Sequence, residues 1–185
     1  MPPKREDSQL SQDSVMTVTP EDRQEILYFA YGSNMSTTQM RQRCPFSTPV
    51  GLGFLEGWKW IINERGYANV VKRSGLEVRA GTDERGVYGL LYLLPPQDEE
   101  KLDTCEGVPW AYEKVTCDAR WVRDGQGRAL DEPVKMMMYV DGKRVAKGLP
   151  RQEYVVRMER AIEDAVCNWG LDGEYAARVM RSLWK

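Results

Sequence analysis

Short runs of apolar and aromatic residues in the first three quarters of the chain predict β-strands. Residues 115–121 alternate apolar with polar side chains, which is the period of a strand that buries one face. Residues 86–94 form a largely continuous apolar run that stops at Pro95. We expect strands over residues 26–31, 54–63, 86–94, 115–121 and 134–140.

The spacing of apolar residues becomes that of a helix after Pro150. Large apolar side chains then recur every three or four positions, which places them on one face of a helix that ends at Gly170. These side chains are Val155, Met158, Ile162, Val166 and Trp169. Further helices are expected over residues 35–43, 97–104 and 174–184. Because strands dominate the middle of the chain and helices its last third, the pattern predicts an α+β fold.

The composition changes once along the chain, near residue 25. Residues 1–24 are rich in Ser, Gln, Asp and Pro and carry few apolar side chains, so we expect a disordered N-terminal tail. Residues 25–185 are expected to form one folded domain, since a domain typically holds roughly 100–200 residues. Within this domain, Gly125-Gln126-Gly127 indicates a hairpin loop, and we place a loop over residues 123–133.

The chain contains no histidine, and this absence removes several classes of chemistry. A Ser/His/Asp triad, a Cys/His nucleophile pair and a histidine metal site all need an imidazole. A general acid or base must therefore be a carboxylate, Lys, Tyr or Cys. The cysteines Cys44, Cys105, Cys117 and Cys167 are too far apart for a Cys-x-x-Cys motif, so we expect reduced thiols and no metal site.

Charge and hydropathy exclude two kinds of partner. The 26 basic and 28 acidic side chains give a net charge of −2, which favours neither nucleic acid nor an anionic membrane surface. No apolar stretch approaches the roughly 18 residues of a membrane-spanning helix, and no apolar run follows Lys4 and Arg5 to indicate a secretory signal. We therefore expect a cytoplasmic protein that binds neither nucleic acid nor membranes.

The loop Tyr31-Gly32-Ser33-Asn34 is the first candidate binding site. Gly32 permits a close approach of the backbone, and the unpaired N–H groups at the start of the next helix favour an anion such as a carboxylate. The same four residues also fit an ordinary turn between a strand and a capped helix. Further along the chain, Tyr154 fits either a hydrogen bond to a ligand or packing on a helix face.

Glu106 is the candidate acid or base. It lies between a predicted helix end and an aromatic stretch, and Val108, Trp110 and Tyr112 are expected to shield it from water and raise its pKa. The alternative is one of several surface acids, since carboxylates are frequent in the preceding helix. The position of Glu106 along the chain does not distinguish a shielded acid or base from an ordinary surface acid.

Taken in order, these motifs resemble the γ-glutamylcyclotransferase-like superfamily, of the γ-glutamylcyclotransferase and γ-glutamylamine cyclotransferase type. Residues 27–34 are similar to its (F/Y)-A-Y-G-S-N signature, and Glu106-Gly107-Val108 followed by Tyr112 resembles its catalytic glutamate segment. The segments 66–70 and 87–92 resemble its central strands, and Tyr154 resembles a tyrosine that contacts substrate.

The resemblance implies a small mixed β-barrel-like sheet flanked by helices. It also implies a lyase without a cofactor, which converts a γ-glutamyl amino acid or amine to 5-oxoproline and the free amino acid or amine. In this family pattern Glu106 is the catalytic acid and base. The substrate-binding residues that the resemblance implies are Tyr28, Phe29, Ala30, Tyr31, Gly32, Ser33, Asn34 and Tyr154.

Three alternatives remain open at this point. In the first, the enzyme acts on glutathione, and in the second it acts on a γ-glutamyl intermediate of secondary metabolism. In the third, the chain is a non-catalytic member of the fold that binds a carboxylate ligand or a protein. Retention of both the glycine loop and Glu106 favours an enzyme. A homodimer is a further expectation, because apolar residues of the last helix either pack inward or form a dimer face. These residues are Val179, Met180, Leu183 and Trp184.

Overall fold

A closed barrel of five strands is the centre of the computed structural model, which describes residues 25–75 and 85–185. The predicted tail, residues 1–24, lies outside the described residues. The order around the barrel is β1-β5-β2-β6-β7, and β3 and β4 form a separate antiparallel ribbon. The barrel strands are β1 (Ile26–Ala30), β2 (Thr48–Glu56), β5 (Gly86–Leu94), β6 (Glu113–Asp124) and β7 (Ala129–Val140). The ribbon strands are β3 (Trp58–Ile62) and β4 (Ala68–Lys72).

The barrel closes through one parallel pair. Strand β1 runs antiparallel to β5 but parallel to β7, with Tyr28 opposite Met137. The carboxyl ends of β1 and β7 therefore lie at the same edge of the barrel. The residues that follow β1 and the last residues of β7 are brought together there, although more than a hundred positions separate them.

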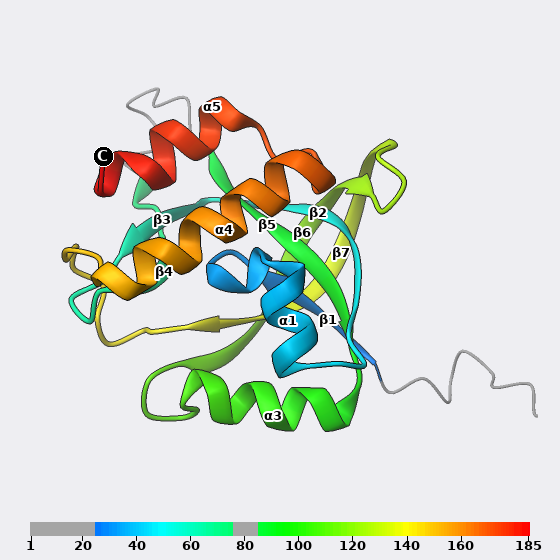
Figure 1. Cartoon of the computed structure of the whole chain (residues 1–185), viewed down its shortest axis with the longest axis horizontal. Helices are drawn as coiled ribbons and strands as arrows, with labels where there is room; N and C mark the ends of the chain where they lie inside the picture. Colours follow the sequence, from blue (N-terminus) through cyan, green and yellow to red (C-terminus); the bar gives the residue numbers. More distant parts are fainter. Residues whose placement is uncertain (1–24, 76–84) are drawn as a thin grey trace, which may run out of the picture.

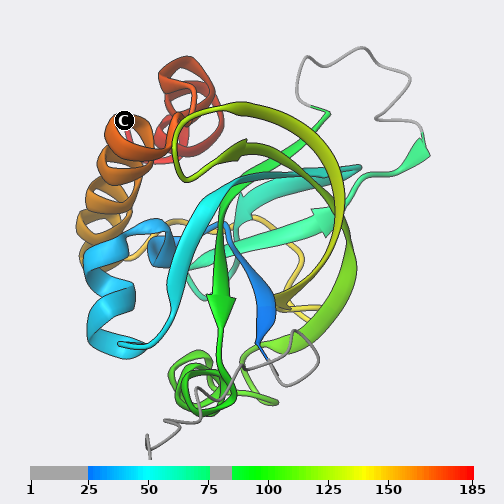
Figure 2. The same cartoon turned by 90° about the vertical axis from the view of Figure 1, so that its right-hand side faces the viewer.

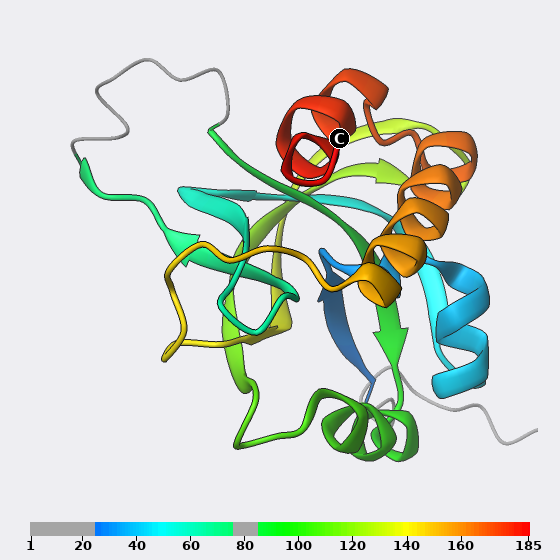
Figure 3. The ribbon, with the colours of Figure 1, turned by 60° about the vertical axis from the view of Figure 1, so that its left-hand side comes forward.

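Helices cover one side and one end of the barrel. The helices are α1 (Thr37–Arg43), α3 (Pro96–Glu106), α4 (Gln152–Trp169) and α5 (Gly173–Tyr175), and η2 (Ser33–Met35) is a short 3-10 turn. Figure 1 shows α4 running diagonally above α1, and Figure 2 shows both on one flank of the barrel. In these views and in Figure 3, α3 lies below the barrel, and Figure 3 also shows the β3–β4 ribbon on the flank opposite α4.

The α+β architecture and the barrel predicted from the sequence are confirmed, but two segments differ from the prediction. The single strand expected over residues 54–63 is two strands, because Gly57, with φ of 79°, interrupts the extended backbone between β2 and β3. The loop expected over residues 123–133 is mostly strand, since β6 and β7 continue into a short hairpin around Gly125-Gln126-Gly127.

The buried face of α4 is rotated slightly from the predicted one. Its fully buried positions include two alanines, Ala161 and Ala165, while Val155 and Val166 are only partly covered. Small side chains at these positions allow α4 to pack closely on the segment that follows β1. Helical periodicity therefore predicted this helix correctly, whereas counting only large apolar residues misplaced its face.

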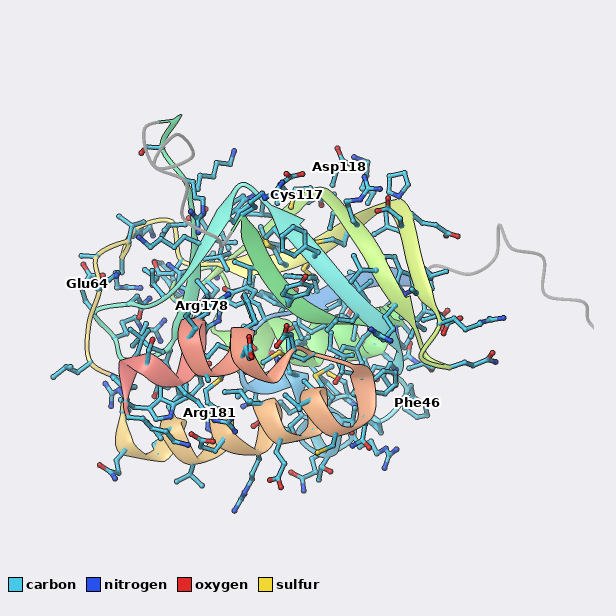
Figure 4. The ribbon with its side chains drawn as sticks, turned by 90° about the horizontal axis from the view of Figure 1, so that it is seen from above. Phe46, Glu64, Cys117, Asp118, Arg178 and Arg181 are labelled. Carbon is cyan, nitrogen blue, oxygen red and sulfur yellow. The ribbon has the colours of Figure 1, made fainter. Side chains whose placement is uncertain are left out.

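The last predicted helix is broken into α5, a π-helical turn η3 (Ala176–Met180) and a 3-10 turn η4 (Arg181–Leu183). Val179 and Met180 are buried within the chain, and the Trp184 ring packs against Trp60. Figure 4 shows Arg178 and Arg181 of this segment on the side of the barrel opposite Cys117 and Asp118 of β6. Much of the apolar face considered for a dimer thus packs inward, and the homodimer stays a prediction.

Two further sequence expectations concern helices and thiols. Within residues 25–75 and 85–185, no helix combines the length and the apolar character needed to cross a membrane. The cysteines Cys44, Cys105, Cys117 and Cys167 all lie in these ranges and carry free thiols.

Candidate functional site

A cavity of about 220 Å³ opens at the barrel edge where β1 and β7 end. It is small beside the roughly 300–1,000 Å³ of typical small-molecule sites, which favours a small ligand. Its walls come from η2, α1, α3, α4, β7 and the β3–β4 ribbon. The residues that line it are Tyr28, Tyr31, Gly32, Ser33, Asn34, Arg43, Arg65, Tyr67, Ala68, Cys105, Glu106, Tyr112, Tyr139, Tyr154 and Arg157.

The loop after β1 is fixed on both sides of Gly32. The Tyr31 hydroxyl donates to the backbone carbonyl of Tyr139 on β7, and the Trp60 indole donates to the Tyr31 carbonyl at 2.9 Å. A Cβ atom on Gly32 would lie 2.8 Å from the Tyr154 hydroxyl and 3.3 Å from the Ala68 Cβ. A side chain on Gly32 would therefore displace the Tyr154 hydroxyl, because the loop passes so close to α4 and β4.

The amide of Asn34 connects this loop to the helices. Its Nδ2 donates to the Tyr28 hydroxyl at 3.0 Å and to Glu106 Oε1 at 2.9 Å. Its Oδ1 accepts hydrogen bonds from Gln39 at 2.8 Å and from Arg43 Nη1 at 3.1 Å. Because Oδ1 faces these two donors, the Nδ2 group is directed at the carboxylate.

Glu106 ends α3, where Gly107 adopts the left-handed conformation of a C-cap. Its side chain is only 17% exposed, and Oε1 lies 3.7 Å from Arg43 Nη1. Burial raises the pKa of Glu106, while the charge of Arg43 and the hydrogen bond from Asn34 oppose the rise. The carboxylate is thus held in place by polar partners and is still easier to protonate than an exposed glutamate.

The shielding of Glu106 differs from the sequence prediction in two of three residues. Trp110 is 80% exposed, so the expectation that it covers Glu106 is wrong, and Val108 does not belong to the described lining of the cavity. Tyr112 does line the cavity as predicted, and the further rings around the carboxylate come from Tyr28 and Tyr139. The turn that follows the α3 C-cap carries Trp110 out to solvent.

Tyr154 and Arg157 lie one turn apart on α4 and face the loop. The backbone N–H of Ser33 donates to the Tyr154 hydroxyl at 3.4 Å, and burial raises the pKa of Tyr154 to about 12. Tyr154 therefore stays a neutral hydroxyl at physiological pH. Arg157 donates to Ser33 Oγ at 3.2 Å and to both carboxylate oxygens of Glu153.

The anion-binding argument from helix geometry needs correction. The helix expected over residues 35–43 begins only at Thr37, after the η2 turn, and the Thr37 N–H donates to Asp164 at 2.8 Å. Ser36 caps the same helix by accepting from the Gln39 N–H. The N-terminus of α1 is thus already satisfied, and the polar groups that face the cavity belong to the loop itself.

Most residues singled out from the sequence meet at this cavity. Tyr28, Tyr31, Gly32, Ser33, Asn34, Glu106 and Tyr154 all line it. Phe29 and Ala30 do not belong to its described lining. The Phe29 ring points to the opposite side of β1, where it packs over Gly53 and Gly89 inside the barrel. Strand alternation accounts for Phe29, since it and its neighbour Tyr28 face opposite sides of β1. It does not account for Ala30, which shares the face of Tyr28.

Several lining residues were not anticipated, namely Arg43, Arg65, Tyr67, Ala68, Cys105, Tyr139 and Arg157. Arg157 had a local signal, because it follows Tyr154 by three positions and so shares its helix face. Tyr139 and Arg65 had none, because β7 and the β3–β4 turn reach the site only through long-range pairing. In the described part of the chain, no group of three or more Cys, Asp or Glu side chains is arranged to hold a metal ion.

Residues 28–156 match the family model "Gamma-glutamyl cyclotransferase, AIG2-like". This range includes the glycine loop, Glu106 and Tyr154. A comparison with curated proteins finds no match.

Solved structures share the fold at low sequence identity. A structure named gamma-glutamyl cyclotransferase has a TM-score of 0.63 and 20% identity, and the match covers 84% of this chain and 86% of that one. An uncharacterised human protein has a TM-score of 0.63 and 21% identity over the same shares of the two chains. YkqA from Bacillus subtilis has a TM-score of 0.63 and 22% identity, covering 88% of this chain and 55% of its own.

The raised pKa of Glu106 predicts how its replacement changes stability with pH. Above the ordinary value of 4.5 the unfolded chain loses this proton, while the folded protein keeps it up to the raised value, so folding stability falls as pH rises through that window. Glu106→Gln lacks this loss. Its free energy of unfolding, measured with urea from about pH 4 to about pH 8, should rise relative to wild type as pH increases. A difference that stays constant or shrinks would contradict the raised pKa.

Proposed function

The chain belongs to the gamma-glutamyl cyclotransferase, AIG2-like family, and we propose that it converts a γ-glutamyl amino acid or amine to 5-oxoproline. The released product is the free amino acid or amine. One observation carries the proposal: Glu106, with a raised pKa, accepts a hydrogen bond at 2.9 Å from Asn34 of the glycine loop inside a small cavity. A possible base and a loop with polar donors thus share one site.

The proposed reaction needs no nucleophile from the protein. The α-amine of the substrate attacks its own γ-carbonyl carbon, and the new C–N bond closes a five-membered ring. Because both groups belong to one molecule, the reaction has the advantage of roughly 7–11 kcal/mol that well-oriented intramolecular reactions have over bimolecular ones, and the site needs only to hold the two groups in the reactive orientation. This chemistry fits a chain without histidine.

Glu106 is the proposed acid and base. Its carboxylate takes one proton from the α-ammonium, which frees the lone pair that attacks, and delivers this proton to the leaving nitrogen as the original amide C–N bond breaks with its electron pair on that nitrogen. The ring nitrogen loses a second proton as it becomes an amide, and the same carboxylate passes it to the leaving amine, which departs as an ammonium. A base serves best when its pKa lies near the working pH, and burial moves the pKa of Glu106 in that direction. No water is consumed, and the carboxylate is regenerated.

The developing oxyanion needs a donor, and Tyr154 offers one beside the loop. Its hydroxyl accepts from the Ser33 N–H at 3.4 Å, which leaves its own O–H to donate to the oxyanion. Such donors are worth about 3 kcal/mol each in other acyl-transfer sites. Gly32 lets these groups approach one another, because any side chain there would displace Tyr154.

Four broader predictions accompany the reaction. We propose that residues 25–185 form the catalytic domain and that it acts without a cofactor on a small γ-glutamyl compound. A cytoplasmic location and a homodimer remain predictions. The non-catalytic alternative, a protein that binds a carboxylate ligand, is tested by the same experiments.

Replacing the proposed base separates catalysis from binding. Glu106→Gln keeps the shape and the oxygen that accepts from Asn34 but cannot take a proton, so 5-oxoproline formation should fall by about 100-fold to 10,000-fold. The Kd of this variant for the substrate, measured by calorimetry, should stay within a few-fold of the wild-type KM. Glu100→Gln is the matched control, since Glu100 is an exposed acid on the same helix.

Wild-type turnover by Glu106→Gln would remove Glu106 from the mechanism. Binding without any 5-oxoproline in the wild-type protein, over a panel of γ-glutamyl amino acids, γ-glutamyl amines and glutathione, would support the binding-protein alternative instead.

A methyl group on Gly32 tests the role of the loop. The added Cβ forces the Tyr154 hydroxyl to move, so Gly32→Ala should lower kcat/KM for 5-oxoproline release by about 10-fold to 100-fold, as expected for a small displacement of positioned groups. Gly142→Ala is the control, because a Cβ there meets no described atom within 4 Å. Equal kinetics for both variants would mean that the loop is only a turn.

A further inference from the structure

The described lining of the cavity carries more positive than negative charge. Among the residues that the structure describes, Arg43, Arg65 and Arg157 line it together with the single acidic side chain of Glu106. Two of these arginines have close partners within the protein. Arg43 bonds Asn34 and lies 3.7 Å from Glu106, and Arg157 bonds Glu153 through Nε at 3.0 Å.

The backbone of Arg65 is held firmly in the turn between β3 and β4. Its N–H donates to Asn63 Oδ1 at 3.0 Å, and its carbonyl accepts from Arg151 Nε at 2.9 Å. Figure 4 shows the preceding residue, Glu64, at the outer edge of the molecule, far from Phe46. Arg65 therefore enters the cavity from the β3–β4 ribbon, whereas Asn34 and Glu106 belong to the loop after β1 and to α3.

The guanidinium of Arg65 is oriented by aromatic rings more than by acids. It lies 5.5 Å from the ring centres of both Tyr67 and Tyr112, which also line the cavity. Its contacts to Ala111 O at 3.5 Å and to Asp141 Oδ2 at 3.9 Å are long. Asp141 makes a much shorter contact of 2.7 Å with Arg144. Within the described residues, Arg65 has no carboxylate at hydrogen-bond distance.

The wall from which Arg65 enters the cavity distinguishes two carboxylates of a substrate. Arg43 and Arg157 bond Asn34 and Ser33 of the loop after β1, at 3.1 Å and 3.2 Å, so they lie on the side where the proposed reaction holds the γ-glutamyl part. Arg65 enters instead from the turn of the ribbon. A carboxylate on the leaving amino acid lies beyond the bond that breaks, and Arg65 is the arginine left to meet it.

We infer that Arg65 binds a carboxylate on the leaving group, and that the substrate is a γ-glutamyl amino acid and not a γ-glutamyl amine. This inference rests on the proposed function, which leaves both classes open. A guanidinium that already lies over two rings loses little rotational freedom when it forms a paired hydrogen bond with a carboxylate. Arg65 is thus a specificity residue outside the acid and base chemistry.

A pair of substrates that differ only in this carboxylate tests the inference. γ-Glutamylalanine and γ-glutamylethylamine have the same carbon skeleton apart from the carboxylate. A hydrogen bond to a charged group is worth about 1.5–3 kcal/mol, so wild-type kcat/KM should be about 10-fold to 150-fold higher for γ-glutamylalanine. Arg65→Gln should raise KM for γ-glutamylalanine and so remove most of this preference. It should change kcat/KM for γ-glutamylethylamine little. Arg65→Lys, which keeps the charge, should recover part of it.

Arg128→Gln is the control for a general loss of charge, because Arg128 is an exposed residue of the β6–β7 hairpin that pairs with Asp124. It should leave the preference intact. Equal wild-type turnover of the two substrates would overturn the inference. An equal loss on both substrates in Arg65→Gln would also overturn it, because Arg65 would then act on the γ-glutamyl part.

Failure of the proposed function gives a different result, namely no 5-oxoproline from either substrate. Calorimetric binding of the same two compounds then decides the inference. Tighter wild-type binding of γ-glutamylalanine that disappears in Arg65→Gln would support the carboxylate site. Equal binding of the two compounds would overturn it.

Discussion

The hydrogen bond from the Asn34 amide to the Glu106 carboxylate is the contact on which the site depends. It joins the loop after β1 to the end of α3, two segments that are 72 positions apart. Arg43 fixes the orientation of the amide from its other side, and burial keeps the carboxylate easy to protonate. The same contact thus positions the proposed base and places it beside the loop donors.

The barrel explains why these segments meet. The parallel pairing of β1 with β7 gathers the loop and Tyr139 at one edge, and residues of α3 and α4 complete the lining of the cavity. This arrangement buries the Glu106 carboxylate away from most water, and the burial raises its pKa. Such local destabilisation is common where a protein needs reactive groups. The ribbon adds Arg65, a cation whose described partners leave it able to meet a ligand.

Local signals in the sequence predicted part of this picture. The strand over residues 86–94 was predicted with its observed bounds, because a glycine begins it and prolines end it. The glycine loop and Glu106 were found through motif order. Phe29 was misplaced because the motif was carried over as a block, without regard to the two faces of a strand. Tyr139 and Arg65 were missed because only strand pairing brings them to the cavity, and no local spacing reports it.

Intramolecular attack is the central claim, and the source of oxygen in the products tests it most directly. Wild-type protein is incubated with γ-glutamylalanine in heavy-oxygen water, and the products are analysed by mass spectrometry. Cyclisation predicts unlabelled 5-oxoproline and unlabelled alanine in equal amounts, because no water enters the reaction. Glutamate that carries one heavy oxygen atom would show hydrolysis and would contradict the account.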